Sequence, residues 1–292
     1  MKPGIYVARE LSNEAYHADT SAISKSGLDL IHRSPAHYYA AKLDPDRPAE
    51  KKDTPALRFG RAFHTLVLEP DLFFQEYAVL PEKVDRRTKA GKEAWAEFEA
   101  ELGGREALTA EDGQRLGAMA AAVRAHPAAK LLLSDGVAEQ SAVWDDFMTG
   151  ARCKCRMDWW RGRRGRGPQR IAVDLKTTTN ASRFPFRKSV VDFRYHVQAA
   201  FYSDGWKAVT DDEVRAFLLI AVEKEPPYGV AVYQLDEELV EAGRRAYMAD
   251  LALYASCVER GEWPAYSSEV EVLDAPAWMT MTTKDEEEKN NA

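Results

Sequence analysis

The stretch Arg-Ile-Ala-Val-Asp-Leu-Lys-Thr-Thr, residues 170–178, combines a strand pattern with two opposite charges. Its branched apolar residues alternate with Asp174 and Lys176, so a strand directs the apolar side chains to one face and both charged groups to the other. On its own, such a pair is usually a solvated surface feature. A carboxylate is also a ligand for Mg²⁺ or Mn²⁺, however, and a neighbouring lysine can orient a water molecule or stabilise charge on a phosphate. The stretch therefore predicts a strand that carries a candidate phosphodiesterase centre.

A second alternating run precedes this stretch. Residues 151–159 alternate between polar and apolar side chains, and an acid, Asp158, ends the polar row. The connection at 161–168 is rich in Arg and Gly and is typical of a hairpin loop. The two runs predict a β-hairpin that brings Asp158 beside Asp174, so that two carboxylates can hold one metal ion.

Two predicted helices supply further candidates. A helix is expected over about residues 190–209, and Tyr195, Gln198 and Tyr202 fall on one of its faces. Another amphipathic helix, far upstream, carries His64 beside its apolar stripe. A lone histidine in such a place is more often a packing residue, although neutral imidazole also suits Mn²⁺.

The order of these residues is specific. His64, then Asp158, then Asp-Leu-Lys at 174–176, then Gln198-x-x-x-Tyr202, resembles the motifs of the RecB-like branch of the PD-(D/E)xK nucleases. The resemblance implies that His64 is a metal ligand and not a packing residue. It supports a nuclease more strongly than any of the residues does alone.

Within that branch, the chain is similar to the exonuclease VIII (RecE) nuclease domain. The segments at 16–19, 23–26 and 34–38 resemble the opening of that family, and the resemblance extends over about residues 4–265. It implies an α+β fold with a restriction-endonuclease-like core. In that core a mixed central β-sheet carries the acids and helices flank the sheet.

The chemistry of phosphodiester hydrolysis suggests roles for these residues, because it needs an activated water and positive charge near the phosphate. We expect one or two Mg²⁺ or Mn²⁺ ions to be held by the side chains of His64, Asp158 and Asp174 and by the backbone carbonyl of Leu175. Lys176 would position the nucleophile or stabilise the transition state. The resemblance implies that Gln198 and Tyr202 hold the DNA backbone or orient Lys176.

A further acid is expected on the strand predicted at 137–147. Glu139, near the start of this strand, is a candidate additional metal ligand. Asp145 and Asp146 are equally available acids, and spacing alone favours none of the three. The choice therefore stays open at the level of the sequence.

The composition fits a soluble intracellular enzyme. The 292 residues, 45% of them hydrophobic, can form a packed core, and we expect one domain over 1–270 with a helical insertion around 82–135. Residues 271–292 predict an acidic, disordered tail. Three cysteines are too few for a disulfide framework, which indicates a reducing cytoplasm. No signal peptide and no apolar run of about 18 residues is found.

The charge of the chain is unevenly distributed. The formal net charge is −7 and the pI is about 5.5, which argues against a protein that coats DNA nonspecifically. Five arginines nevertheless lie within ten residues, in the hairpin connection and at the start of the strand that follows it: Arg161, Arg163, Arg164, Arg166 and Arg170. The first four are candidate DNA-binding residues, and a solvated hairpin tip is an equally good interpretation.

The resemblance also implies a substrate and partners. It implies 5′-to-3′ digestion of linear double-stranded DNA, leaving 3′ single-stranded overhangs for a RecT-like annealing protein in phage-type recombination. The host would be a bacterial cell and the source a phage or prophage. Because an acidic chain offers few phosphate contacts, processive digestion would need a ring, and we expect a homotetramer.

Two alternatives stay open. The chain could be a catalytically inactive nuclease fold that binds DNA or protein, although the intact Asp158, Asp174 and Lys176 favour an enzyme. It could also be another RecB-like nuclease, such as a CRISPR-associated enzyme with an iron–sulfur cluster. The lack of four suitable cysteines argues against that second alternative.

Overall fold

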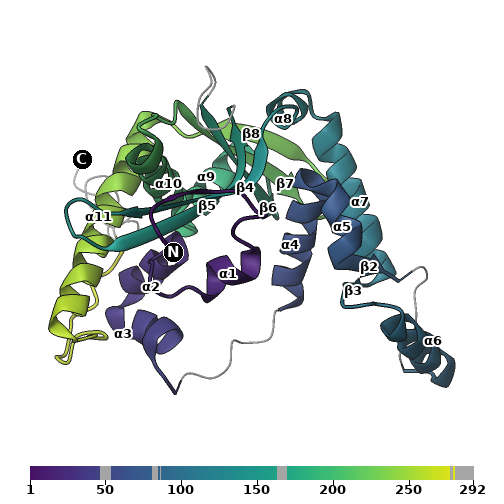
Figure 1. Ribbon diagram of the computed structural model, residues 1–292, viewed down its shortest axis with the longest axis horizontal. Helices are drawn as coiled ribbons and strands as arrows, with labels where there is room; N and C mark the ends of the chain where they lie inside the picture. Colours follow the sequence, from purple (N-terminus) through teal and green to yellow (C-terminus); the bar gives the residue numbers. More distant parts are fainter. Residues whose placement is uncertain (47–53, 81–84, 86, 163–169, 277–278, 280–292) are drawn as a thin grey trace, which may run out of the picture.

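A mixed β-sheet forms the centre of the computed structural model (Figure 1). The structure describes residues 1–46, 54–80, 85, 87–162, 170–276 and 279. The sheet has six strands in the order β1-β4-β5-β6-β7-β8, and β6 and β7 are its parallel pair, the other neighbours being antiparallel. The strands are β1 (Gly4–Tyr6), β4 (Val137–Asp145), β5 (Arg152–Arg161), β6 (Ile171–Thr178), β7 (Ala216–Glu223) and β8 (Val230–Gln234). These strands confirm the predicted α+β fold class and the β5–β6 hairpin.

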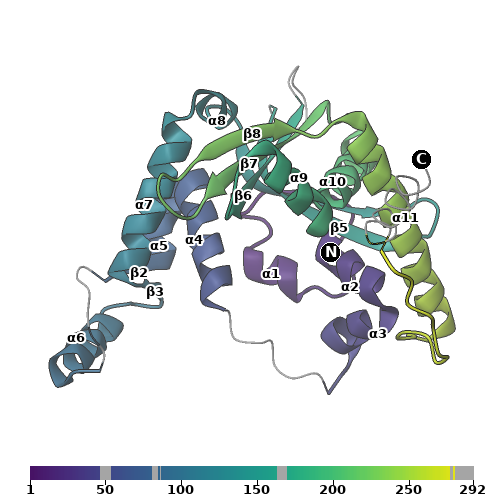
Figure 2. The same ribbon diagram turned by 180° about the vertical axis from the view of Figure 1, so that it is seen from behind.

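Helices cover both faces of this sheet (Figures 1 and 2). One face packs against α2 (Lys25–Arg33), α9 (Arg183–Asp192), α10 (Tyr195–Thr210) and α11 (Glu237–Arg260). The other face packs against α4 (Pro55–Leu68), α5 (Pro70–Glu76), α7 (Ala110–Ala125) and α8 (Pro127–Leu132). Within the part of the chain that the structure describes, no helix is long and apolar enough to cross a bilayer.

Local sequence explains where several helices begin. The side chains of Ser24, Thr54, Thr109 and Asp236 each accept a hydrogen bond from a backbone N–H in the first turn of the helix that follows. Such caps satisfy amide groups that have no partner inside the helix. At the other end of α11, Gly261 adopts a φ of 68°, a left-handed conformation that favours glycine and ends the helix.

A small second sheet joins the region predicted as a helical insertion, 82–135, to the segment just before it. Strands β2 (Tyr77–Val79) and β3 (Glu106–Leu108) pair in parallel, with α6 (Lys89–Ala100) between them in the sequence. Helix α6 extends away from the rest of the molecule (Figure 1). Helices α7 and α8, by contrast, contribute to the core beneath the main sheet. Helices α7 and α8 of the insertion are therefore part of the core, whereas α6 projects from it.

The N-terminal segment lies against β5 through buried cations. It includes α1 (Asn13–Ala18), and it continues through α2 to α3 (Pro35–Tyr38) and a π-helix (Tyr39–Leu43). Lys154 donates to the carbonyls of Tyr16 and Asp19, and Arg156 donates to the carbonyl of Leu11 at 2.7 Å. Lys154 and Arg156, in the middle of the polar row on β5, are therefore buried, and this segment supplies the acceptors that buried cations require.

One helix prediction is wrong. The segment expected to form a single helix over 190–209 is broken at Phe193 and Arg194, where α9 ends and α10 begins. Arg194 has φ 55° and ψ 40°, and its guanidinium pairs with Asp29 of α2 and Asp250 of α11. These partners lie far away in the sequence, so helical periodicity alone could not reveal the break.

Strand β5 departs from strict alternation next to its acid. Met157 and Trp160 pack in the same core, whereas Trp159 packs in the core on the other face of the sheet. Directly across from this irregularity, Glu139 of β4 has a φ of 52°. A non-glycine residue in this left-handed region is uncommon, and such conformations concentrate at functional sites. The irregularity involves the residues that form the candidate centre.

Candidate metal and catalytic centre

Three carboxylates lie on three neighbouring strands. The register of β4 with β5 sets Glu139 opposite Asp158, with regular pairs on either side of them. The register of β5 with β6 places Asp158 next to Asp174, one step beyond the last paired residues. The hairpin therefore brings Asp158 and Asp174 together as the sequence predicted, and β4 adds the third acid.

His64 reaches this group of acids from α4. Its Nδ1 lies 3.3 Å from Oδ2 of Asp158, and one ligand atom from each of His64, Glu139 and Asp158 lies within 4.8 Å of the others. The same Asp158 oxygen accepts a hydrogen bond of 2.9 Å from the backbone N–H of Leu175. Two ligands of one Mg²⁺ ion, each bound at about 2.1 Å, are at most about 4.2 Å apart, so a small contraction would let the three side chains share an ion.

The electrostatics of the cluster favour a cation. Burial, together with the nearby Asp158 carboxylate, raises the pKa of Glu139 to about 8. Burial and the Asp174 carboxylate also raise the pKa of Asp158. The carboxylates are held together against their mutual repulsion, and a divalent ion bound by them and by the imidazole of His64 would offset that repulsion. The residues present therefore fit a divalent metal site.

Asp174 forms the other half of the centre. Its Oδ2 lies 2.6 Å from Nζ of Lys176, and its Oδ1 accepts a hydrogen bond from the side-chain amide of Gln198. Gln198 accepts in turn from Lys176 at 3.0 Å. The Asp174 side chain is only 2% exposed, and its buried Oδ2 has the ion pair with Lys176 but accepts no hydrogen bond. Asp174 lies outside the three-residue cluster, and its role as a metal ligand stays a prediction.

Lys176 is held as a cation. Burial lowers the pKa of its ammonium, but the carboxylates of Asp174 and Asp158 outweigh burial and raise the pKa above its usual value. The ring of Tyr195 lies 4.5 Å from Nζ of Lys176, an additional favourable contact for a positive charge. Tyr195 and Gln198, predicted to share one face of a helix, thus both contact Lys176 from α10.

The remaining predicted residues are less tightly connected to the centre. The ring of Tyr202 packs against Phe217 with centroids 6.4 Å apart, and its role at DNA stays a prediction. Leu175 contributes its backbone N–H, as described above, while a role for its carbonyl is a prediction only. Arg161 ends β5, and Arg170 pairs with Asp212 at 2.7 Å. The other three arginines of the run, Arg163, Arg164 and Arg166, lie outside the described residues, as do most of the predicted acidic tail and Trp278.

The structure separates the three acids that spacing left equivalent. Asp145 pairs with the guanidinium of Arg152, and Asp146 accepts hydrogen bonds from Thr149 in the turn that follows β4. Glu139 is the acid that lies beside Asp158. The signal that singles it out is its backbone conformation, which the sequence does not reveal.

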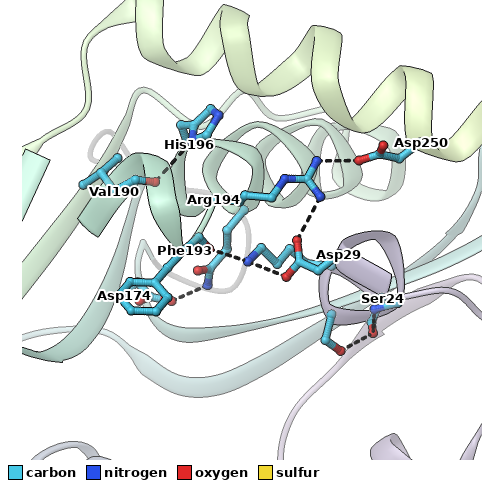
Figure 3. A network of polar contacts seen from close by, with 12 residues as sticks. Ser24, Asp29, Asp174, Val190, Phe193, Arg194, His196 and Asp250 are labelled. Carbon is cyan, nitrogen blue, oxygen red and sulfur yellow. Dashed lines mark hydrogen bonds and ion pairs between the residues drawn. The ribbon is translucent and has the colours of Figure 1, made fainter. Parts of the chain in front are cut away.

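The sequence analysis did not predict the ion pairs that hold the start of α10 in place. Arg194, Asp29 and Asp250 form an ion-pair network at the start of α10, shown in Figure 3. One signal was available, because Asp250 interrupts the otherwise apolar buried face of α11 between Tyr247 and Leu251. A charged residue at such a position needs a buried partner.

Comparisons with known proteins show the family of this chain and support its fold. The family described as "PDDEXK-like domain of unknown function (DUF3799)" matches residues 24–276. A crystal structure from Eubacterium rectale, described as "Putative exonuclease", is similar with a TM-score of 0.62 and 16% identity, covering 93% of this chain and 98% of that chain. The structure of SSO0001 has a TM-score of 0.27 at 16% identity over 66% of this chain and 86% of that chain, which is too low to indicate a common fold. No curated protein matches the sequence.

Proposed function

This chain belongs to the family of PDDEXK-like domains of unknown function (DUF3799), and from that premise we propose that it is a divalent-metal-dependent exonuclease acting on linear double-stranded DNA. One observation carries the proposal. The His64, Glu139 and Asp158 cluster lies next to Asp174, and Asp174 holds the ammonium of Lys176. An anionic cluster beside a fixed cation is the arrangement that phosphodiester hydrolysis requires.

The residues divide into two groups in this proposal. His64, Glu139 and Asp158 would hold the divalent ion, with Asp174 as a further ligand from the neighbouring strand. When bound there, the ion would supply Lewis-acid stabilisation of the charge that develops on the phosphate. Mg²⁺ and Mn²⁺ are both compatible with two carboxylates and an imidazole.

Lys176 belongs to the second group. Its Nζ can donate a hydrogen bond to a phosphate oxygen or orient the attacking water, because it keeps its proton in this environment. Gln198 and Asp174 fix the direction of the lysine side chain through the contacts of 3.0 and 2.6 Å. Gln198 is therefore proposed to orient the lysine.

The finer parts of the proposal rest on the resemblance to the exonuclease VIII (RecE) nuclease domain. We expect 5′-to-3′ digestion that leaves 3′ single-stranded overhangs, and a RecT-like annealing protein as the partner that receives them. The setting would be phage-type recombination in the cytoplasm of a bacterial host. The "Putative exonuclease" description of the Eubacterium rectale protein supports the exonuclease part of this expectation.

A time course on linear duplex labelled at the 5′ or the 3′ end tests the proposal. The purified chain should release 5′-terminal nucleotides first and leave the complementary strand intact, in Mg²⁺ or Mn²⁺ but not in EDTA. A mock purification from cells that lack the gene, run in parallel, controls for contaminating nuclease. A chain that binds DNA but releases no nucleotides with either ion would instead support the catalytically inactive alternative.

A further inference from the structure

An exposed aromatic ring lies beside the candidate centre, at the turn between α9 and α10. Phe193 is 61% exposed, and its ring stacks against Tyr195 with centroids 5.7 Å apart and an interplanar angle of 25°. The ring of Tyr195 lies 4.5 Å from Nζ of Lys176. Two successive contacts therefore connect an open phenyl ring to the proposed catalytic ammonium.

The backbone that carries Phe193 is held in place from several directions. Nζ of Lys25 donates a hydrogen bond of 2.8 Å to the carbonyl of Phe193. The next residue, Arg194, has a left-handed backbone and pairs with Asp29 at 3.1 Å and with buried Asp250 (Figure 3). A single exposed apolar side chain is ordinary on a protein surface. Phe193, however, is an exposed apolar side chain on a turn that has a left-handed residue, is held by several contacts and lies beside the candidate centre. Such conformations concentrate at functional sites, so its exposure indicates a contact with substrate.

Helix α9, which leads to this turn, is basic and carries a second exposed ring. Arg183, Arg187 and Lys188 are exposed on it. Phe184 is 71% exposed, and the guanidinium of Arg187 lies 5.5 Å from the centre of its ring. Proteins that bind single-stranded nucleic acid combine these two features, since cations follow the phosphates and aromatic rings stack on the bases.

We propose that Phe193 stacks on an unpaired nucleobase of the strand under hydrolysis and that α9 binds the adjoining single-stranded phosphates. This rests on the proposed exonuclease function and deepens it. A paired base inside a duplex has both of its faces covered by its neighbours, so the ring can engage only a base at or beyond the end of the duplex. Stacking would hold the terminal nucleotide with its phosphate next to Lys176, and ends with frayed or unpaired terminal bases would be preferred over blunt, GC-rich ends.

Fluorescence of 2-aminopurine, which falls when the base stacks on an aromatic ring, tests the proposal without cleavage. The full chain is mixed in EDTA with an oligonucleotide duplex that carries 2-aminopurine at an unpaired 5′-terminal position. Wild type should quench the probe, Phe193→Tyr should keep the quenching, and Phe193→Leu should lose it. Phe147→Ala is the matched control, because Phe147 is 96% exposed at the turn between β4 and β5, away from the centre.

A second measurement separates stacking from a structural effect. With Mg²⁺ or Mn²⁺ present, Phe193→Leu should raise KM on frayed ends at least about fivefold, the lower end of what loss of one base–aromatic stack costs, with kcat nearly unchanged. The difference between frayed and blunt ends should shrink in this variant. Phe193→Tyr should behave as wild type in both measurements, and Phe147→Ala should as well.

The outcomes distinguish this proposal from the one on which it rests. Wild type that digests DNA without quenching the probe, or Phe193→Leu that quenches as wild type does, would overturn the stacking role and leave the exonuclease proposal intact. Wild type that quenches the probe through Phe193 but hydrolyses nothing would instead overturn the exonuclease proposal and retain a single-strand binding site.

Discussion

The ammonium of Lys176 lies 2.6 Å from the carboxylate of Asp174, two residues earlier on the same strand, and the amide of Gln198 contacts both groups. Side chains two apart on a strand point the same way, so β6 itself creates the pair. Helix α10 supplies Gln198, a neutral side chain that holds the carboxylate and the ammonium in place and leaves both charged. The centre thus keeps its negative and positive groups adjacent.

Removal of the acid charges should abolish cleavage. Asp158→Asn and Asp174→Asn keep the size of each side chain but remove a negative oxygen that a divalent ion requires, so we expect the rate of digestion to fall at least about a hundredfold. Circular dichroism should show an unchanged fold. Near wild-type digestion by either purified variant would show that the centre lies elsewhere.

Lys176 should be separable from the metal ligands. Lys176→Gln preserves a hydrogen-bond donor for Asp174 but removes the positive charge, so turnover should fall at least about a hundredfold while the divalent ion still binds. Isothermal titration calorimetry with Mn²⁺ measures the binding directly. Loss of Mn²⁺ binding in a folded Lys176→Gln variant would contradict the assignment.

Metal binding should release a proton from Glu139. The pKa of this carboxyl is raised to about 8, so at pH 7 most of the metal-free protein carries the proton, and the ion must displace it. The apparent affinity should therefore increase as the pH rises towards 8 and level off above it. Calorimetry in two buffers with different ionisation enthalpies counts the protons, and Glu139→Gln should bind more weakly and release fewer. Equal proton release by Glu139→Gln and wild type would assign the titration to another group.

The ion pairs of Arg194 should contribute much of the stability of the α9–α10 turn. Arg194→Ala removes the guanidinium from buried Asp250 and leaves it with the ring of His32, whose Nδ1 lies 3.2 Å from its Oδ1, so we expect a loss of about 3 kcal/mol of unfolding free energy, the lower end of the cost of breaking a buried ion pair. Arg170→Ala is a matched control, because Arg170 also has a positive φ but its ion pair with Asp212 is more exposed, with side-chain exposures of 33% and 15%. Arg170→Ala should lower the unfolding free energy by about 1 kcal/mol or less. Urea unfolding compares the two, and equal losses would assign the effect to the backbone conformation.

A homotetrameric ring is the expected assembly. The chain has a net charge of −7, so several subunits around one channel would be needed to gather enough positive charge to retain DNA during digestion. Light scattering at micromolar concentration should give the mass of four chains, and engaged molecules should be digested to completion in the presence of excess unlabelled DNA. A monomer that digests DNA distributively would exclude the ring and leave the proposed chemistry untouched.

Local patterns in the sequence were sufficient to predict the strands and much of the centre. Alternation predicted β5 and β6, and the hairpin between them implied that Asp158 lies beside Asp174. Both predictions follow from the two-residue repeat of a strand and from the reversal of the chain at a hairpin. The side chains of Tyr195 and Gln198 were likewise placed together by helical spacing.

Features that depend on distant contacts could not be predicted in this way. The choice of Glu139 over Asp145 depends on a left-handed backbone at one position of β4. The break at Arg194 depends on acids from α2 and α11. The parallel pairing of β2 with β3 joins strands of three residues each, which are too short to give a periodic signal.

The contributions to the centre are spread widely along the chain, and this has a consequence for biosynthesis. His64 comes from α4, the acids come from β4, β5 and β6, and Gln198 comes from α10, so a chain still emerging from the ribosome lacks a complete set until α10 has been made and packed. Domains generally fold as units, and contacts between distant segments form late. A DNA-degrading activity built in this way would stay latent in nascent and truncated chains, which protects the cell that makes it.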